Sequence, residues 1–236
     1  MSAPQNHSGP LTVIARIRTL LPEKFGVPRQ SGLIESLKGV IVFEKPFRNA
    51  NALRGLDNFS HLWLIWGFSE AVQAGWSALV RPPRCGGNIK IGVFASRSPF
   101  RPNPLGLSCV RIEEIETDSE LGPQIHVSGV DLIDNSPIYD LKPYLPYTDS
   151  HPEAKDHFSK LLSERKLSVN ITAELLNLIP TSDQPALIDI LSHDPRPAYQ
   201  QDSGRIYGLR FASYNIRFKI YGTELTVYEI TEQPER

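Results

Sequence analysis

The chain has 236 residues and a formal net charge of −1, with 40% hydrophobic and 22% charged residues. These values are typical of a soluble globular protein with one large domain, or with one domain and a smaller appendage. No apolar run approaches the roughly 20 residues of a membrane helix, and the first ten residues lack the pattern of a secretory signal. The two cysteines, Cys85 and Cys109, have no CxxC spacing. We therefore expect a cytoplasmic protein without a membrane partner, a disulfide framework or a metal site.

Short strand patterns dominate the first 150 residues. Strands are expected at 12–18, 33–37, 40–44, 61–68, 89–95, 107–115, 124–130 and 138–141. Residues 33–37 and 40–44 are read as a hairpin that turns at Lys38-Gly39, and 47–56 as a short helix. About eight short strands with hardly a helix predict a closed or nearly closed antiparallel barrel. A doubly wound sheet is not supported, because it needs alternating helices, and the Gly-x-Gly-x-x-Gly fingerprint of a Rossmann site is missing as well.

The pattern changes beyond Pro146. A charged helix or linker is expected at 150–165, a strand at 167–178 whose second half could be helical, and a short helix at 185–192. A small sheet is expected from 206–209, 214–221 and 224–230. The predicted fold class is mainly β, with a single-sheet antiparallel β-barrel and a small α+β C-terminal domain. The predicted division is a flexible leader (1–10), a barrel domain (11–148) and a C-terminal domain (149–236).

Positive charge is concentrated between residues 71 and 112, where Arg and Lys occur without any Asp or Glu. The members are Arg81, Arg84, Lys90, Arg97, Arg101 and Arg111. Several prolines stiffen the loops that carry them, since proline fixes φ and removes a backbone donor. A guanidinium on a stiff loop suits phosphate or carboxylate oxygens. A solvated surface loop is the alternative reading.

Other polar and aromatic residues are open to two readings. His61 is either a structural histidine at a strand end or a catalytic group. Trp63 and Trp66 either pack in the core or stack on a base. The carboxylates of Asp131 and Asp134 either shape a turn or hold a ribose or an amine. Similarly, Asp194 either shapes a rigid turn before Pro195 or takes part in the chemistry.

Several long motifs in the same order resemble the TsaA-like family, whose bacterial members are the TrmO tRNA methyltransferases. The motifs include Val27-Pro28-Arg29-Gln30, Phe59-Ser60-His61-Leu62-Trp63, Phe100-Arg101-Pro102-Asn103-Pro104, Asp131-Leu132-Ile133-Asp134, Lys142-Pro143-Tyr144-Leu145-Pro146 and Asp194-Pro195-Arg196-Pro197-Ala198-Tyr199. The resemblance runs from about Leu11 to the C-terminus. It implies an S-adenosylmethionine-dependent homodimer that methylates N6 of N6-threonylcarbamoyladenosine at position 37 of tRNA, beside the anticodon.

The resemblance also implies site residues. Donor-binding residues carried over from the family are Pro28, Arg29, Gln30, Ser69, Glu70, Arg97, Leu107, Gly129, Val130, Asp131 and Leu132. Where the family has His-Gln, this chain has Ser69-Glu70, so side-chain contacts there differ. Asp131 and Asp194 are the candidates to polarise the N–H or take its proton. Candidate RNA-binding residues are Arg81, Arg84, Arg101, Arg196, Tyr199, Arg205, Arg210 and Arg217.

Two other functions are compatible with the same residues. A non-catalytic RNA-binding adaptor would bind tRNA without the methyl donor. A methyltransferase for another RNA or for a small molecule would keep the donor site and would not distinguish modified from unmodified tRNA.

Overall fold

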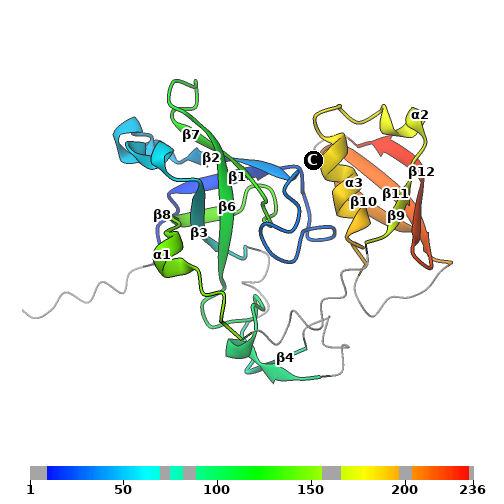
Figure 1. Cartoon of the computed structure of the whole chain (residues 1–236), viewed down its shortest axis with the longest axis horizontal. Helices are drawn as coiled ribbons and strands as arrows, with labels where there is room; N and C mark the ends of the chain where they lie inside the picture. Colours follow the sequence, from blue (N-terminus) through cyan, green and yellow to red (C-terminus); the bar gives the residue numbers. More distant parts are fainter. Residues whose placement is uncertain (1–9, 70–74, 82–88, 156–165, 197–203, 234–236) are drawn as a thin grey trace, which may run out of the picture.

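Two β units make up the molecule in the computed structural model, which describes residues 10–69, 75–81, 89–155, 166–196 and 204–233. A barrel lies on one side, and a small sheet carrying a helix lies on the other (Figure 1). This arrangement confirms the predicted fold class of a barrel followed by a smaller α+β unit.

The barrel is a single closed sheet. Its strands are β1 (Ala15–Thr19), β2 (Lys38–Phe43), β3 (His61–Gly67), β6 (Leu105–Glu116), β7 (Gln124–Ser128) and β8 (Pro137–Pro143). They pair antiparallel in the order β1-β2-β7-β6-β3-β8, and β8 closes the barrel on β1. Side chains alternate along each strand because the period of a strand is two residues. In β3 the residues Leu62, Leu64 and Trp66 are buried inside, whereas Trp63 and Ile65 keep some exposure outside.

Residues 68–104 leave the barrel between two strands that are direct neighbours, β3 and β6. The described part of this excursion holds β4 (Leu79–Val80) and β5 (Ile91–Gly92), which form a two-stranded sheet of their own, followed by a 3-10 turn, η5 (Val93–Ala95). The expected strand at 89–95 was therefore wrong in length, and it lies outside the barrel. The strand ends at Gly92 because the 3-10 turn begins at Val93.

The expected hairpin at 33–44 was also wrong. Lys38 and Gly39 belong to β2, where they pair with Ser128 and Val127 of β7. Residues 33–37 form turns instead, in which the N–H of Leu37 donates to the carbonyl of Ile34 (3.2 Å). Gly39 is needed for close packing, since a Cβ there would lie 3.0 Å from Cδ1 of Ile17. With neither 33–37 nor 89–95 in the barrel, six of the eight expected strands remain in it.

The expected helix at 47–56 consists of three short 3-10 turns. They are η1 (Lys45–Phe47), η2 (Ala50–Leu53) and η3 (Leu56–Asn58). Asn49 begins the second turn by accepting a hydrogen bond from the N–H of Asn51 (3.0 Å). Gly55, with φ +87°, separates the second turn from the third. Arg48 (ψ 69°) and Asn49 (ψ 112°) already have non-helical backbone angles between the first turn and the second, so the apolar spacing alone was misleading.

The C-terminal unit has a four-stranded sheet in the order β10-β11-β12-β9. Its elements are β9 (Ser168–Asn170), α2 (Ala173–Leu176), α3 (Gln184–Ser192), β10 (Tyr207–Phe211), β11 (Tyr214–Tyr221) and β12 (Glu224–Glu232). Residues 167–178 thus divide into a short strand and a helix, and the helix at 185–192 and the small sheet are confirmed.

Among the described residues, no helix has the length and apolar character to cross a membrane. The expected charged segment at 150–165 lies mostly outside the described residues.

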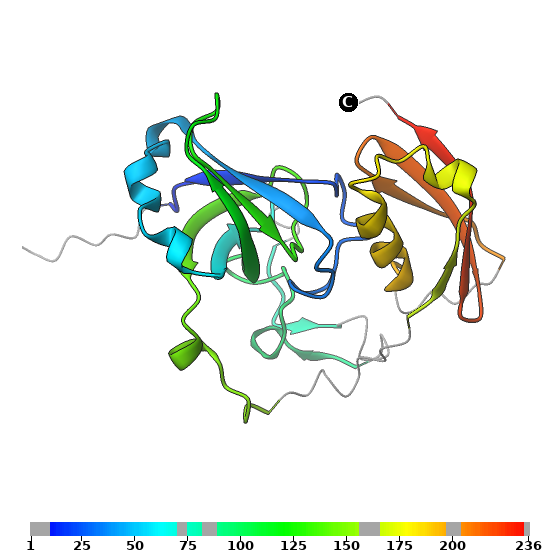
Figure 2. The same ribbon diagram turned by 45° about the horizontal axis from the view of Figure 1, so that its top comes forward.

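The two units contact each other directly. Helix α3 lies on the barrel-facing side of the small sheet (Figure 2) and buries Ala186, Leu187, Ile190 and Leu191. Ser36 Oγ of the barrel unit donates to Asp189 Oδ2 on α3 (2.5 Å), and the N–H of Ala212 donates to the carbonyl of Leu20 (2.7 Å). The loop between β1 and β2 therefore lies between the barrel and the C-terminal unit.

Candidate functional site at the barrel mouth

Two loops far apart in the sequence meet at Gln30 and Arg97. The Arg97 guanidinium donates a hydrogen bond to the Gln30 side-chain oxygen. Gln30 lies in the loop between β1 and β2, and Arg97 follows η5 in the excursion. Because both were predicted donor-binding residues, the fold brings together two members of that set. The partner of Arg97 here is a neutral amide, which leaves the guanidinium charge able to attract an anion.

The loop that carries Gln30 is fixed to the barrel by its next two residues. Ser31 Oγ accepts a hydrogen bond from the N–H of Cys109 on β6 (3.0 Å), and the N–H of Gly32 donates to the carbonyl of Gly129 (2.8 Å). Both glycines have positive φ, +78° and +74°, and a Cβ at Gly129 would lie 3.2 Å from Cα of Gly32. The close backbone approach therefore requires glycine at 129, one of the predicted residues.

Asp131 follows directly after this contact, and its carboxylate faces the same mouth. Ser108 Oγ of β6 donates to Asp131 Oδ1 (2.6 Å), and Trp66 Nε1 of β3 donates to Ser108 Oγ (2.9 Å). Burial raises the pKa of Asp131 from 3.8 to about 6, against the opposing effects of the Ser108 hydrogen bond, of main-chain hydrogen bonds at Asp131 and Ser31, and of the charge of Arg97. The main chain of Ser31 bonds Asp131, and the neighbouring Gln30 bonds Arg97, so one loop contacts both of these predicted residues.

The neighbours of Asp131 have structural roles. Val130 and Leu132 are buried, at 1% and 0% exposure, so their contribution to a ligand is limited to the main chain. Asp134 Oδ1 accepts a hydrogen bond from the N–H of Thr19 (2.9 Å), and the N–H of Asp134 donates to Leu21 (2.8 Å). Of the two carboxylates in this turn, Asp134 thus holds β1 in place, whereas Asp131 faces the site.

Arg29 connects the site to the C-terminal unit. Its guanidinium donates to the main-chain carbonyl of Arg196 (3.3 Å), while the preceding Pro28 is buried. The Arg196 guanidinium makes two 2.8 Å hydrogen bonds to the Asp194 carboxylate, which raise the pKa of Arg196. The Arg196 side chain is only 13% exposed, which leaves little of it for contact with RNA.

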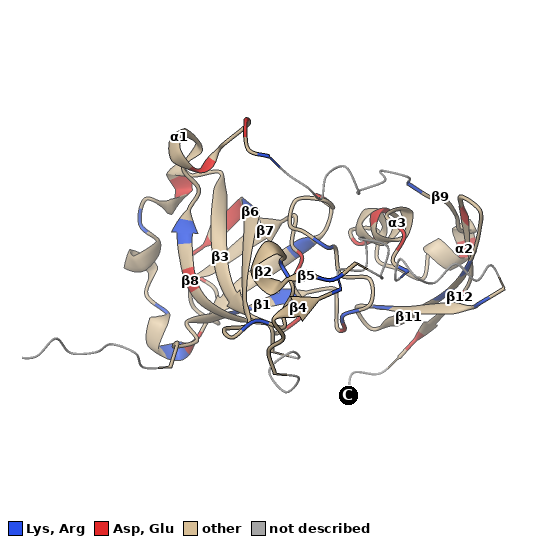
Figure 3. Ribbon diagram, turned by 90° about the horizontal axis from the view of Figure 1, so that it is seen from below, with Lys and Arg blue, Asp and Glu red and all other residues tan. Residues whose placement is uncertain are grey.

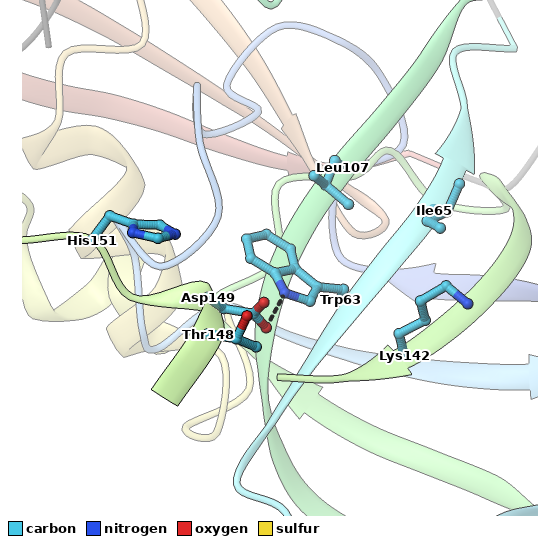
Figure 4. Close-up of a pocket in the computed structure, with 7 residues that line it drawn as sticks. All are labelled: Trp63, Ile65, Leu107, Lys142, Thr148, Asp149 and His151. Carbon is cyan, nitrogen blue, oxygen red and sulfur yellow. Dashed lines mark hydrogen bonds between the residues drawn. The ribbon is translucent and has the colours of Figure 1, made fainter. Parts of the chain in front are cut away.

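Leu107 was predicted at the donor site, and its side chain lies on the outer face of β6. Leu107 is 51% exposed and lines an outer pocket of about 350 Å³ with Trp63 and Asp149 (Figure 4). Trp63 Nε1 donates to Asp149 Oδ2 (2.9 Å). The hydrogen bond from the N–H of Leu145, followed by the one from Trp63, lowers the pKa of Asp149. Since Ser108 points inward from the same strand, the fold separates the Leu107 side chain from the Asp131 cluster.

The predicted RNA-binding arginines have different surroundings. Arg81 and Arg205 are exposed, and the Arg205 guanidinium lies over the Tyr207 ring. Arg101 is held by the carbonyls of Val93 (2.9 Å) and Ser96 (2.7 Å), and Arg217 pairs with Glu229 (2.9 Å). Arg210 is half-buried. In Figure 3, several Lys and Arg segments lie on the side where the barrel faces the small sheet.

Three predicted residues lie outside the described part of the chain: Glu70, Arg84 and Tyr199. Ser69, beside Glu70, is exposed just after β3.

The sequence analysis missed Ser31, Ser108 and Trp66. A signal for Ser108 was present, because it is a polar residue at an inward position of a strand that is otherwise apolar on that side. Trp66 was considered only for the core or for base stacking. Its hydrogen bond to Ser108 depends on the pairing of β3 with β6, which local sequence does not reveal.

Fold and site together define a single-sheet barrel protein with a polar cluster at the barrel mouth, built from the β1–β2 loop, the excursion and the turn after β7. The family model for the tRNA-methyltransferase O N-terminal domain matches residues 16–150, and that for the TrmO C-terminal domain matches residues 164–233. The chain belongs to the tRNA-methyltransferase O family.

Individual relatives agree with this assignment. A tRNA (adenine(37)-N6)-methyltransferase of Escherichia coli K12 is 38% identical over 227 residues, covering 92% of this chain and 95% of the relative. A protein of Pyrococcus abyssi, named as a probable S-adenosyl-L-methionine-binding protein, is 35% identical over 136 residues, which cover 58% of this chain and 68% of that protein. A crystal structure of TrmO from P. aeruginosa superposes with a TM-score of 0.76 at 27% identity, covering 98% of this chain and all of that one.

Proposed function

We propose that this chain transfers the methyl group of S-adenosylmethionine to N6 of adenosine 37 in tRNA, with N6-threonylcarbamoyladenosine as the substrate base. The observation that carries the proposal is the cluster of Gln30, Arg97, Gly129 and Asp131 at the barrel mouth, in a chain whose two halves both match the family. The division into a donor-binding barrel (11–148) and a tRNA-contacting C-terminal unit (149–236) is part of the proposal.

The residues present suit the methyl donor. Arg97 offers a guanidinium for its carboxylate, and Asp131 offers a negative charge to its amino or sulfonium group. Gly32 and Gly129 keep their backbone close together at the mouth, where a side chain would fill the space. Pro28, Arg29, Gln30 and the main chain from Gly129 to Leu132 would border the donor. S-adenosylmethionine, when bound, supplies an electrophilic methyl group.

Asp131 is better suited than Asp194 to take the proton from N6. Both oxygens of Asp194 accept hydrogen bonds from Arg196, so this carboxylate is engaged in holding the Arg196 guanidinium. Asp131, with a pKa of about 6, is ionised at neutral pH and yet has more affinity for a proton than an ordinary aspartate. We assign proton transfer to Asp131, and to Asp194 the task of holding Arg196. Positioning of the amine and exclusion of water account for the rest of the rate.

Binding of the anticodon loop rests on local positive charge, since the chain is nearly neutral overall. Arg81, Arg101, Arg205, Arg210 and Arg217 are candidates for phosphate contacts, which make affinity dependent on salt. Arg210→Glu is expected to weaken tRNA binding at least tenfold at 150 mM salt and to leave donor affinity unchanged. An equal loss of both affinities in a folded variant would contradict this assignment.

We further propose that the active form is a cytoplasmic homodimer. The described part of the excursion exposes five large apolar side chains, Trp76, Leu79, Ile89, Phe94 and Phe100. Exposed apolar surface of this kind is covered at protein interfaces, and a second copy is the partner that the family resemblance indicates. Light scattering at assay concentration is expected to give twice the chain mass, and a monomer that retains full activity would contradict the proposal.

A methylation assay tests the function directly. We expect methyl transfer to tRNA that carries N6-threonylcarbamoyladenosine and at least a hundredfold less to the same tRNA without the threonylcarbamoyl group. Equal activity on both would indicate a different substrate, and tRNA binding without donor binding would indicate an adaptor.

Arg97→Ala tests the donor site by calorimetry. We expect it to lose at least tenfold in S-adenosylmethionine affinity. Arg111→Ala is the matched control, because Arg111 is an exposed arginine of the barrel that pairs only with Glu113 (3.6 Å) among the described ion pairs. Unchanged affinity in Arg97→Ala would remove Arg97 from the donor site.

A further inference from the structure

We infer that Trp66 and Ser108 form a hydrogen-bond relay that holds Asp131 as an ionised carboxylate at the barrel mouth. Both are positioning residues, because they act through Asp131 and are buried behind it, at 6% and 1% exposure. The inference deepens the proposed function and rests on it for the role of Asp131.

The direction of the relay follows from the chemistry of its members. An indole N–H can only donate, so Ser108 Oγ must accept from Trp66 (2.9 Å). The single proton of the Ser108 hydroxyl is then free to point at Asp131 Oδ1, 2.6 Å away. That distance is in the range of a hydroxyl bonded to an ionised oxygen. Protonation of Asp131 at this oxygen would remove the acceptor of the Ser108 hydroxyl proton. The relay therefore favours the ionised carboxylate over the protonated acid.

The indole is fixed in the orientation that the relay needs. Trp66 pairs with Gly106 across β3 and β6, and a Cβ at Gly106 would lie 2.2 Å from Cε2 of the Trp66 ring. The ring therefore lies directly on the main chain of Gly106. Ser108 is two residues further along β6, on the same inner face. Glycine at 106 thus allows the indole N–H to reach Ser108.

The other groups that act on Asp131 come from different elements. The main chain of Ser31 approaches from the β1–β2 loop, and Arg97 approaches from the excursion. Among the described residues, Arg97 is the charged side chain that influences Asp131. Arg97 lies in an exposed loop, whereas the relay is buried in the barrel wall. The relay therefore reaches the carboxylate from the barrel wall, whereas Ser31 and Arg97 reach it from loops.

The test is a titration of the Asp131 carboxyl group by carbon NMR in the full chain labelled at aspartate, with Asp131→Asn to assign the signal. Ser108→Ala is expected to raise the pKa of Asp131 by about one unit, because a hydrogen bond to the charged form is lost. Trp66→Phe is expected to raise it by about half a unit, because the hydroxyl is then free to rotate. At pH 6 a shift of one unit lowers the ionised fraction about fivefold, and at pH 7 about twofold.

Two matched controls remove the same groups elsewhere. Trp63 lies on the outer face of β3, the strand that also carries Trp66, and Trp63→Phe removes an indole that donates to Asp149. Ser182→Ala removes a hydroxyl that donates to Asp183 (2.9 Å). Both should leave the pKa of Asp131 unchanged. A cooperative urea unfolding transition identifies the variants that are folded. Trp66→Phe decides the result if Ser108→Ala is not folded.

The outcomes separate the inference from the proposed function. A pKa of Asp131 that stays within about 0.2 units of the parent in the folded relay variants would overturn the relay. If the pKa of Asp131 rises and the acid limb of the pH profile of kcat/KM moves to higher pH with it, both the relay and the role of Asp131 are supported. If the pKa rises while the acid limb stays in place, the relay holds, and the assignment of proton transfer to Asp131 is wrong.

Discussion

The guanidinium of Arg29 donates a hydrogen bond to the main-chain carbonyl of Arg196, 3.3 Å away across 167 residues of sequence. Arg29 is next to Gln30, which bonds Arg97, and Arg196 is bonded to Asp194. The C-terminal unit therefore supports the loop that borders the barrel mouth. Arg196 of the C-terminal motif thus contacts the loop at the barrel mouth without belonging to the barrel.

Gly26 tests the packing between the two units. Gly26→Ala is expected to lower the free energy of unfolding by about 2 to 4 kcal/mol, since φ is +91° there and a Cβ would lie 2.2 Å from Cδ1 of Leu209. Gly222→Ala is the control, because it has φ +57° with nothing within 4 Å, and about 1 kcal/mol is expected. Urea unfolding measures both. Equal losses would mean that Leu209 moves aside freely.

The ion pair of Asp194 tests the support of the loop. Asp194→Asn is expected to cost about 2 kcal/mol of unfolding free energy, because it leaves the largely buried guanidinium of Arg196 without its counter-charge. Glu229→Gln breaks the exposed pair with Arg217, where both side chains are at least 40% exposed, and should cost much less, because water screens the two charges. Thermal unfolding of both variants provides the comparison, and similar losses would show that burial of Arg196 has little effect.

Asp131 makes stability depend on pH. Its pKa is about 6 in the folded chain and near 3.8 when unfolded, so the folded state binds the proton more tightly. The folded state then holds more protons between about pH 4 and 6, and the free energy of unfolding falls as pH rises through that window. From pH 4.5 to 7.5 this contribution falls by about 2 kcal/mol. Urea unfolding of the parent and Asp131→Asn should show this difference, and parallel pH curves would contradict it.

Gly106 tests how closely the indole of Trp66 packs. Gly106→Ala is expected to destabilise by about 1 to 3 kcal/mol, because the new methyl group would overlap a buried ring. Gly92→Ala, on β5, is the control. It has no neighbour within 4 Å and ordinary extended backbone angles (φ −59°, ψ 140°), and should stay within about 0.5 kcal/mol of the parent. A neutral Gly106→Ala would mean that Trp66 can shift.

Local sequence predicted the elements whose signal is local. The strand β3 was recognised because a strand that is buried in the fold reads as a short apolar run, and α3 was recognised as a short helix. The same signals, with the absence of alternating helices, predicted a mainly β barrel followed by a smaller unit. The motifs then indicated Gln30, Arg97, Gly129 and Asp131 through the family resemblance.

Pairing was decided only by the tertiary structure. Lys38-Gly39 reads as a turn, yet it forms part of a strand because β7 provides a pairing partner. The helix expected at 47–56 is interrupted at Arg48 and Asn49, whose backbone angles are not helical. The hydrogen bonds of Trp66, Ser108 and Asp131 depend on the register of β3 against β6 and on the turn after β7. A sequence records which residues are apolar, charged or conformationally free. Which donor meets which acceptor depends on strand order and loop closure, because these bring together residues that are distant along the chain.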